Sequence, residues 1–296
     1  MYNLYNKLHH LDFAMRNMKP HFRQLDVAVR HLDIATHNLK PNFCLFDVTM
    51  RDGLQSMSNV YTMKHKKKLL DRIIKNCPTK DIEIGSMVSP KILPQMRGSL
   101  ALYKYAEKKY PTHNFYMLVP NQHLFTKAME NGVKNFSFIT SVSDAFQEKN
   151  INKSLDDTQY ELFQMTNQLT SKNKSKLYVS CVTECPINGK IPIEQVAFKI
   201  NNNLNFEIDN ICISDTCGTL SISDYKYIID NVNQDQLNKI SLHLHNPSNP
   251  DLQDIIQYSL ARNITRFDVS YIDAGGCSVT IDGGKMKSNL TYEIFE

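Results

Sequence analysis

Two pairs of residues in this sequence have the types and the spacing that could do chemistry. Arg51 and Asp52 come directly after an apolar run and directly before Gly53. His243 and His245 are one residue apart in a second apolar run, so both imidazoles point to the same side if that run is a strand. Neutral imidazoles and a carboxylate are suitable ligands for a divalent metal. The sequence therefore predicts a metal site that combines Asp52 with the two histidines.

Each pair also has a purely structural explanation. Aspartate is a common helix N-cap, so Arg51 and Asp52 taken alone are more typical of the start of a helix. A single buried histidine is usually a hydrogen-bonded core residue. Two histidines on one face, with an aspartate available from another strand, favour the metal site over the core explanation.

The elements that must position these residues alternate regularly from residue 43 onward. Short apolar runs are separated by longer segments with a helical pattern, such as KKKLLDRIIKN and IEQVAFKINNN. The runs are FCLFDVT, KDIEIGS, NFYMLVP, NFSFITS, KLYVSCV, NICISDT, KISLHLH and RFDVSYI. Eight strand and helix units in about 250 residues are typical of a (β/α)8 TIM barrel, whose strands are buried on both sides. We therefore expect one catalytic barrel domain over residues 43–296.

Polar residues gather where the predicted strands end, which is where a barrel of this type carries its catalytic groups. They come from all eight runs and would meet on one face. They are Arg51, Asp52, Glu83, Ser86, Asn121, Ser141, Thr183, Glu184, Asp215, Thr216, His243, His245, Asp273, Gly275 and Gly276.

The composition is that of a globular protein with an ordinary charge balance. The 296 residues are 42% hydrophobic and 22% charged, and the formal net charge of +4 is too small a surplus to indicate a nucleic-acid partner. No apolar run approaches the roughly 20 residues of a membrane helix, so no membrane partner is expected. Seven cysteines without a framework spacing favour a reducing compartment, and we expect a cytoplasmic protein.

A basic run stands at residues 64–68 and leads into LLDRIIKN. It is most typical of the solvated face of an amphipathic helix, and contact with phosphate or CoA is the alternative. The run is therefore predicted to lie in solvent.

Residues 1–42 have a different pattern. Written in sevens they read LHHLDFA, MRNMKPH, FRQLDVA, VRHLDIA and THNLKPN. This apolar heptad stripe predicts an N-terminal helical extension that packs on a partner helix or on a second subunit, so a homo-oligomer is expected. Pro20 and Pro41 divide it into helices at about 3–19 and 22–39. The alternative is a duplicated coding stretch that forms a poorly ordered tail.

Several ordered motifs of the barrel region resemble those of a known enzyme family. In chain order they are DVTMRDGLQS, IEIGSMVSPKILPQM, FQEKNINKS, YVSCVTECP, SDTCGTLS, LHLHN, GGC and SNLTYE. Together they resemble the 3-hydroxy-3-methylglutaryl-CoA lyases, metal-dependent barrel enzymes related to the isopropylmalate and homocitrate synthases. The resemblance runs from about residue 43 to the last residue.

The resemblance implies a ligand set and a reaction. Asp52, His243, His245 and Asn289 would hold one Mg²⁺ or Mn²⁺, and Arg51 would lie over the carbonyl of an acyl-CoA thioester. The implied reaction is a retro-Claisen cleavage of 3-hydroxy-3-methylglutaryl-CoA, or of a related 3-hydroxyacyl thioester, to acetyl-CoA and acetoacetate. Metal ligation would acidify the substrate hydroxyl, and Arg51 would stabilise the enolate.

The resemblance also implies residues that move protons. Cys277 matches the family's cysteine on a mobile loop, where a thiol can take part in proton transfer. A free cysteine is more often a small core residue, but the glycine-rich loop favours the functional role. Glu83, Asp215 and Glu293 match acidic positions of the family and are expected to be supporting or relay groups.

Some segments depart from the family pattern. Ser278 replaces a proline, the run from Cys277 to Asn289 is longer than usual, and NPSNP replaces a glycine-containing segment after the histidines. Two alternatives to the lyase therefore remain. One is a condensing acyltransferase of the isopropylmalate or homocitrate synthase type, and the other is a catalytically weak barrel that serves as a binding or assembly module. The SPKILPQM and GGC segments favour the lyase over the synthase.

Overall fold

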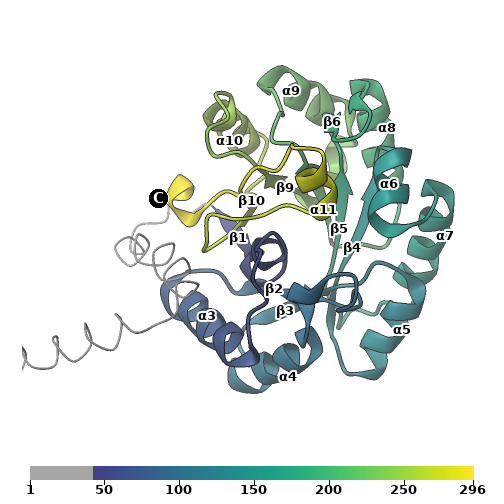
Figure 1. Cartoon of the computed structure of the whole chain (residues 1–296). Coiled ribbons are helices and arrows are strands. Elements are labelled where there is room, and N and C mark those ends of the chain that lie inside the picture. The colour runs from purple at the N-terminus through teal and green to yellow at the C-terminus, as the bar shows by residue number, and fades with distance from the viewer. Residues whose placement is uncertain (1–42) are drawn as a thin grey trace, which may run out of the picture. The chain divides into compact units, whose positions relative to one another are not determined.

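The computed structural model describes residues 43–296, which form a closed barrel of parallel strands surrounded by helices (Figure 1). The strands follow each other around the barrel in the order β1-β10-β9-β8-β5-β4-β3-β2. They are β1 (Cys44–Asp47), β2 (Asp81–Ser86), β3 (Asn114–Leu118), β4 (Asn135–Ser141), β5 (Ser175–Ser180), β8 (Asn210–Asp215), β9 (Ile240–Leu244) and β10 (Arg266–Val269). Each contains or overlaps one predicted apolar run, so the prediction of a TIM barrel is confirmed.

The predicted N-terminal helices at 3–19 and 22–39 lie outside the described residues. The domain division at residue 42 and the expected homo-oligomer therefore stay predictions.

The strands are buried on both faces, as the continuous apolar runs predict. Every residue of β5 and β8 is buried, and these two strands pair in parallel from Lys176 opposite Asn210 to Ser180 opposite Ser214. One face of each strand packs on the surrounding helices, and the other fills the barrel interior.

The helices form the outer ring in Figure 1. Several begin where the side chain of an N-cap residue accepts a backbone hydrogen bond, as Asn121 does from Leu124 N at 2.9 Å. Asn121 therefore caps a helix although its strand-end position made it a site candidate. The long helices are α3 (Met63–Asn76), α4 (Ser99–Lys109), α5 (Gln122–Glu130), α6 (Asp144–Ile151), α7 (Leu155–Thr166), α8 (Ile193–Leu204), α9 (Ile222–Asn231) and α10 (Leu252–Ala261).

The prediction that the whole basic run lies in solvent is wrong at one residue. Lys66 is only 3% exposed, because its place on α3 is on the same side as Leu69, Leu70 and Ile73, which pack on the barrel. Its ammonium donates to the carbonyl oxygens of Gln95 and Arg97, which offset the cost of removing the charge from water. Its neighbours Lys64 and Lys68 are exposed, as expected.

Several short elements had no clear signal in the sequence. They include a π-helical turn η1 (Thr49–Gly53), the hairpin of β6 (Glu184–Cys185) and β7 (Gly189–Lys190), and a short helix α11 (Ser278–Asp282). The remaining turns are the 3-10 segments η2 (Pro94–Met96), η3 (Gln234–Lys239) and η4 (Tyr292–Phe295). Helix α6 was also not predicted, although its residues belong to one of the family-like motifs.

The last segment of the chain is fixed to the first strand. The Tyr292 hydroxyl donates to Asp47 Oδ2 at 2.8 Å, and the rings of Phe295 and Phe43 lie 5.0 Å apart. Among residues 43–296, no helix combines the length and the apolar character that crossing a membrane requires.

Candidate active site

Arg51 and Asp52 lie in the π-helical turn η1 at the carboxyl end of β1, and both are almost fully buried. Arg51 Nη1 donates to Asp52 Oδ1 at 2.5 Å, and Arg51 Nε donates to Glu83 Oε2 on β2 at 2.6 Å. Asp52 Oδ2 accepts from the backbone N–H of Gly276 and from the Asn289 amide, each at 2.9 Å. Asp52 is therefore not a helix cap, because its oxygens bind groups from distant parts of the chain.

The three charges of this cluster do not balance. One guanidinium faces the carboxylates of Asp52 and Glu83, which leaves a surplus of one negative charge in a buried place. Burial alone would lower the pKa of Arg51, but the two carboxylates raise it well above its usual value. Burial would raise the pKa of Asp52, but the Arg51 guanidinium, together with the hydrogen bond from the Gly276 backbone N–H, holds it below its usual range. A bound cation would offset the surplus charge.

His243 and His245 present the same ring nitrogen to this cluster. His243 Nδ1 lies 3.1 Å from Asp268 Oδ2, and His245 Nδ1 lies 2.9 Å from the Lys287 carbonyl oxygen. Because both partners are acceptors, a hydrogen on each Nδ1 would satisfy them, and the neutral form of either ring would then leave the lone pair of Nε2 for a metal. Burial lowers the pKa of His245 to about 4, so this ring is neutral at physiological pH.

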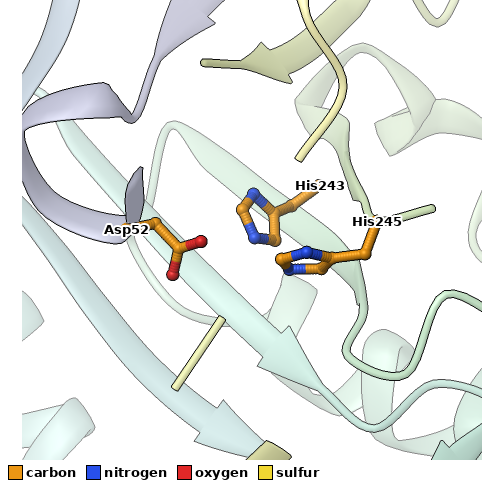
Figure 2. Close-up of side chains that lie close together, drawn as sticks. All are labelled: Asp52, His243 and His245. Atoms are coloured by element: carbon orange, nitrogen blue, oxygen red, sulfur yellow. The ribbon is translucent and has the colours of Figure 1, made fainter. Parts of the chain in front are cut away.

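The three predicted ligands meet in space. One ligand atom from each of Asp52, His243 and His245 lies within 4.8 Å of the other two. Figure 2 shows the Asp52 carboxylate facing the two imidazole rings, which come from β9 and the residue that follows it. The structure thus places these three side chains, which come from distant segments of the sequence, beside one another.

Asn289 supplies a fourth suitable atom. Its Nδ2 donates to Asp52 Oδ2 at 2.9 Å and to the Ala274 carbonyl at 3.0 Å, whereas its Oδ1 is buried without a hydrogen-bond partner among the described residues. A buried oxygen with no partner is costly unless something binds it. Two nitrogens and two oxygens form a donor set that fits a divalent cation.

Gly275 allows the loop after β10 to approach this cluster closely. Its φ is +156°, and a Cβ placed there would lie 2.2 Å from Asn289 Nδ2 and 2.8 Å from Asp52 Oδ2. No side chain fits at that distance. The glycine of the GGC motif is therefore a requirement of the ligand geometry.

The cluster opens into a cavity of about 160 Å³ at the carboxyl ends of the strands. Its lining includes polar groups such as Arg51, Asp52, Ser180, Ser214 and Thr216. It also includes apolar side chains, which are Val88, Ile92, Leu93, Leu118, Pro120, Ile139, Phe146 and Ile151. The cavity therefore suits a ligand that has both a charged end and an aliphatic portion.

Cys277 lies on the wall of this cavity and caps α11. Its backbone N–H donates to Thr280 Oγ1 at 3.1 Å, which fixes the start of the short helix. Burial raises the pKa of the thiol, so the sulfur keeps its proton at neutral pH. A protonated thiol can donate a hydrogen to a carbanion.

The three predicted acidic residues have different surroundings. Glu83 is fully buried beside Arg51 and also accepts from the Tyr178 hydroxyl at 3.1 Å. Asp215 accepts from the backbone N–H groups of Thr219 and Leu220, so it shapes the loop after β8, and burial raises its pKa. Glu293 is exposed on η4 and does not line the cavity. The structure thus brings Glu83 to the site, but not Glu293.

The segments that depart from the family pattern still support the site. The backbone N–H of Asn246 donates to the Ser288 carbonyl at 2.9 Å, and its side chain donates to the Gly218 carbonyl at 3.0 Å. Asn246, the first residue of the NPSNP segment, therefore links the loop after β8 to the segment just before Asn289. Ser278 lines the cavity at the start of α11.

Sequence reasoning missed several residues of the site. Tyr178 lies under the Arg51 guanidinium, with 5.1 Å between its ring centroid and Arg51 Cζ. Asp268 contacts His243, and Phe146 from the unpredicted α6 lines the cavity. Tyr178 and Asp268 each lie within an apolar run. Only the direction of their side chains, into the barrel interior, distinguishes them from ordinary core residues.

Comparisons with known proteins agree with this geometry. The sequence matches the HMGL-like family model over residues 42–249. The 3-hydroxy-3-isohexenylglutaryl-CoA/hydroxy-methylglutaryl-CoA lyase of Pseudomonas aeruginosa is 30% identical over 230 residues, which cover 77% of this chain and 75% of that relative. The mitochondrial hydroxymethylglutaryl-CoA lyase of Homo sapiens is 30% identical over 229 residues, which cover 77% of this chain and 70% of that relative.

A solved structure indicates the same family. The HMG-CoA lyase of Bacillus subtilis superimposes with a TM-score of 0.77 at 26% sequence identity, over 88% of this chain and 86% of that one. The resemblance stated from the motifs and the expected class, a carbon–carbon lyase, are both confirmed by these relatives. The chain belongs to the HMGL-like family.

Proposed function

We propose that this protein cleaves 3-hydroxy-3-methylglutaryl-CoA, or a related 3-hydroxyacyl thioester, to acetyl-CoA and acetoacetate, and that it requires one divalent cation, Mg²⁺ or Mn²⁺. The observation that carries the proposal is the position of Asn289 Oδ1, a buried oxygen without a partner beside the Asp52, His243 and His245 cluster. Asp52, His243 and His245 line the same cavity as Arg51 and Cys277.

Asp52, His243, His245 and Asn289 would hold the cation. When bound, it would supply Lewis acidity that favours loss of the proton from the tertiary hydroxyl of the substrate. An oxygen-containing donor set of this kind suits Mg²⁺ and Mn²⁺.

The bond changes balance without another reactant. A base takes the proton of the hydroxyl, the bond between C2 and C3 breaks, and C3 becomes the ketone carbon of acetoacetate. The electron pair of that bond passes to C2 and the thioester carbonyl, which gives an enolate of acetyl-CoA. Protonation at C2 then completes the reaction.

Arg51 would stabilise the enolate oxygen. Its guanidinium is held by Asp52 and Glu83 and lies over the Tyr178 ring, so its donors point in a fixed direction before the substrate arrives. A preorganised positive group placed where charge develops is among the larger contributions to catalysis.

Cys277 would supply the proton to C2. Its thiol lines the cavity, and burial keeps it in the protonated form. The adjacent Gly276, with a φ of +112°, gives the loop a hinge that could carry the thiol toward the carbanion and away from it. Glu83 is proposed as a support of Arg51, and Asp215 as a support of the neighbouring loop.

The apolar part of the cavity supports a related substrate as a second candidate. The name of the Pseudomonas aeruginosa relative includes a glutaryl thioester with an isohexenyl branch. Leu118, Ile139 and Phe146 could contact such a branch, because they are apolar residues that line the cavity. We therefore propose comparing both thioesters as substrates. No observation favours the condensing reaction or a catalytically weak assembly module.

The test is the formation of acetoacetate and acetyl-CoA from purified protein that has been stripped of metal. Addition of Mg²⁺ or Mn²⁺ should restore turnover, and a chelator should remove it. Absence of turnover with either thioester and either cation would leave the assembly module as the better explanation.

A reducing compartment such as the cytoplasm is proposed as well, because the seven cysteines form no disulfide.

A further inference from the structure

A buried row of polar side chains crosses the barrel interior below the proposed metal site. Lys176 on β5 and Asp268 on β10 are each 2% exposed, and His243 on β9 is 5% exposed. Lys176 Nζ donates to Asp268 Oδ1, and Asp268 Oδ2 lies 3.1 Å from His243 Nδ1. Neither Lys176 nor Asp268 has a role in the reaction described above.

We propose that Asp268 is a positioning residue, which fixes His243 in the tautomer that presents Nε2 to the cation, and that Lys176 holds Asp268 in place for this purpose. The proposal rests on the proposed metal-dependent function, but the hydrogen position on His243 can be measured in the metal-free protein.

The geometry of the carboxylate carries the inference. Its two oxygens have different partners, one in Lys176 and one in His243, so the carboxylate is held from both sides. Rotation of the Asp268 carboxylate would break both contacts. An imidazole that donates its Nδ1 hydrogen to a fixed acceptor keeps its other nitrogen directed at the metal.

The lysine is itself fixed. Its Nζ lies 3.9 Å from the centroid of the Phe46 ring and 5.0 Å from that of the Tyr178 ring. These aromatic faces favour the ammonium group at one point of the barrel interior. The row Lys176, Asp268 and His243 therefore behaves as one preorganised unit that ends at a metal ligand.

Replacement of Lys176 and Asp268 distinguishes a pair that positions His243 from a buried ion pair that only stabilises the core. Apolar residues of similar volume often replace such a pair without loss of stability. If the pair serves only the fold, replacing both members should leave His243 and metal binding unchanged. If the pair positions His243, the fold should survive and the tautomer should not.

The first experiment uses the unmodified protein without metal. Nitrogen-15 NMR of the histidine rings distinguishes a protonated Nδ1 from a protonated Nε2, and comparison with His243→Gln identifies the signals of His243 among those of the ten histidines. We expect Nδ1 to carry the hydrogen. A hydrogen on Nε2 would overturn the proposal whatever the variants do.

The second experiment compares two double variants that are both uncharged. Lys176→Met with Asp268→Leu removes the acceptor, and Lys176→Met with Asp268→Asn keeps a carbonyl oxygen that can accept from Nδ1. We expect the first variant to show a mixture of tautomers and a Kd for Mn²⁺ raised by about 10- to 100-fold. The second keeps an acceptor that Lys176 no longer holds, so it should keep mainly the parental tautomer and show a Kd for Mn²⁺ between those of the parent and the first variant.

Asp47→Asn serves as a control for the loss of a buried carboxylate. Asp47 is fully buried and accepts from Thr49 and Tyr292, but it makes no hydrogen bond to any histidine within residues 43–296. It should change the thermal stability and leave the His243 signals in place. Parental signals and a parental Kd in the leucine variant would show that Asp268 is only a core residue, even if the enzyme is later found to act on another substrate.

Discussion

The two ends of the barrel both carry a cavity and buried charge, but they use their polar atoms differently. The cavity at the amino ends of the strands is the larger, about 360 Å³ against about 160 Å³. Several of its charged side chains have partners. Lys176 binds Asp268, Lys174 Nζ lies 3.9 Å from Asp81, and Asp209 Oδ2 accepts from the Ser175 backbone N–H at 2.8 Å.

At the carboxyl ends of the strands the pairing is incomplete. Asn289 Oδ1 and Glu83 Oε1 are buried without hydrogen-bond partners among the described residues, and the rings of two histidines lie beside Asp52. A buried polar atom without a hydrogen-bond partner lowers the stability of the fold. The comparison teaches that the smaller cavity, where polar atoms are left free, is the better candidate for binding and chemistry.

Asp52→Ala or His243→Ala should have the largest effect, because each removes a proposed ligand and leaves the others unable to hold the cation. We expect activity to fall by more than about 10³-fold and Mn²⁺ affinity to fall with it. The far-UV circular dichroism spectrum should stay that of the parent. Parental Mn²⁺ affinity in a titration of either variant would remove that residue from the ligand set.

Arg51→Lys tests whether catalysis depends on the positive charge of Arg51 alone or also on the fixed direction of its hydrogen-bond donors. The ammonium keeps the positive charge but loses the planar fork of donors, so turnover should fall by about 10²-fold. The Kd for Mn²⁺ should change little, because Arg51 is not a proposed ligand. Turnover near the parental value would show that the fixed donors of Arg51 do not take part in catalysis.

The pH dependence of stability should report the burial of His245. Its pKa is lowered to about 4 in the folded protein, from a usual value of 6.5. Between these values the unfolded chain binds the proton more readily, so this contribution is fully present above pH 6.5 and is lost as the pH falls toward 4. We expect an effect on the order of 2 kcal/mol on the free energy of unfolding of the metal-free protein.

Comparison with His245→Gln isolates this contribution. The comparison is needed because burial raises the pKa of Asp47 to about 7, so Asp47 stabilises the fold at low pH and that stabilisation is lost as the pH rises toward 7. The parent should lose more stability than the variant between pH 6.5 and pH 4 in urea titrations. Parallel curves would contradict a neutral, buried His245.

Asp209→Ala should have the smallest effect and tests the other end of the barrel. The change removes the acceptor of two hydrogen bonds from Ser175, at 2.8 and 3.0 Å. We expect a loss of about 1 kcal/mol in the free energy of unfolding and no change in Mn²⁺ affinity or turnover. A loss of turnover at full occupancy of metal would mean that the amino-terminal cavity also serves function.

Much of the site could be predicted because its residues stand in short motifs at strand ends. Arg51 and Asp52 follow an apolar run, and the one-residue spacing of His243 and His245 puts both rings on one face of a strand. Asn289 and Cys277 were found through their motifs, since nothing in their local spacing indicates a ligand or an acid. Lys66 was misjudged because the direction in which a helical lysine points depends on the carbonyl groups that lie beside it.

The sequence by itself determined the barrel, its eight strands and the side of β9 on which the histidines lie, because strand periodicity and burial are local properties of the chain. Only the tertiary structure decided which polar atoms are satisfied and which are free. Asp268 meets His243 across neighbouring strands, and Asn289 meets Asp52 across most of the chain. Hydrogen bonds between such distant segments depend on closure of the barrel, and no local pattern encodes them.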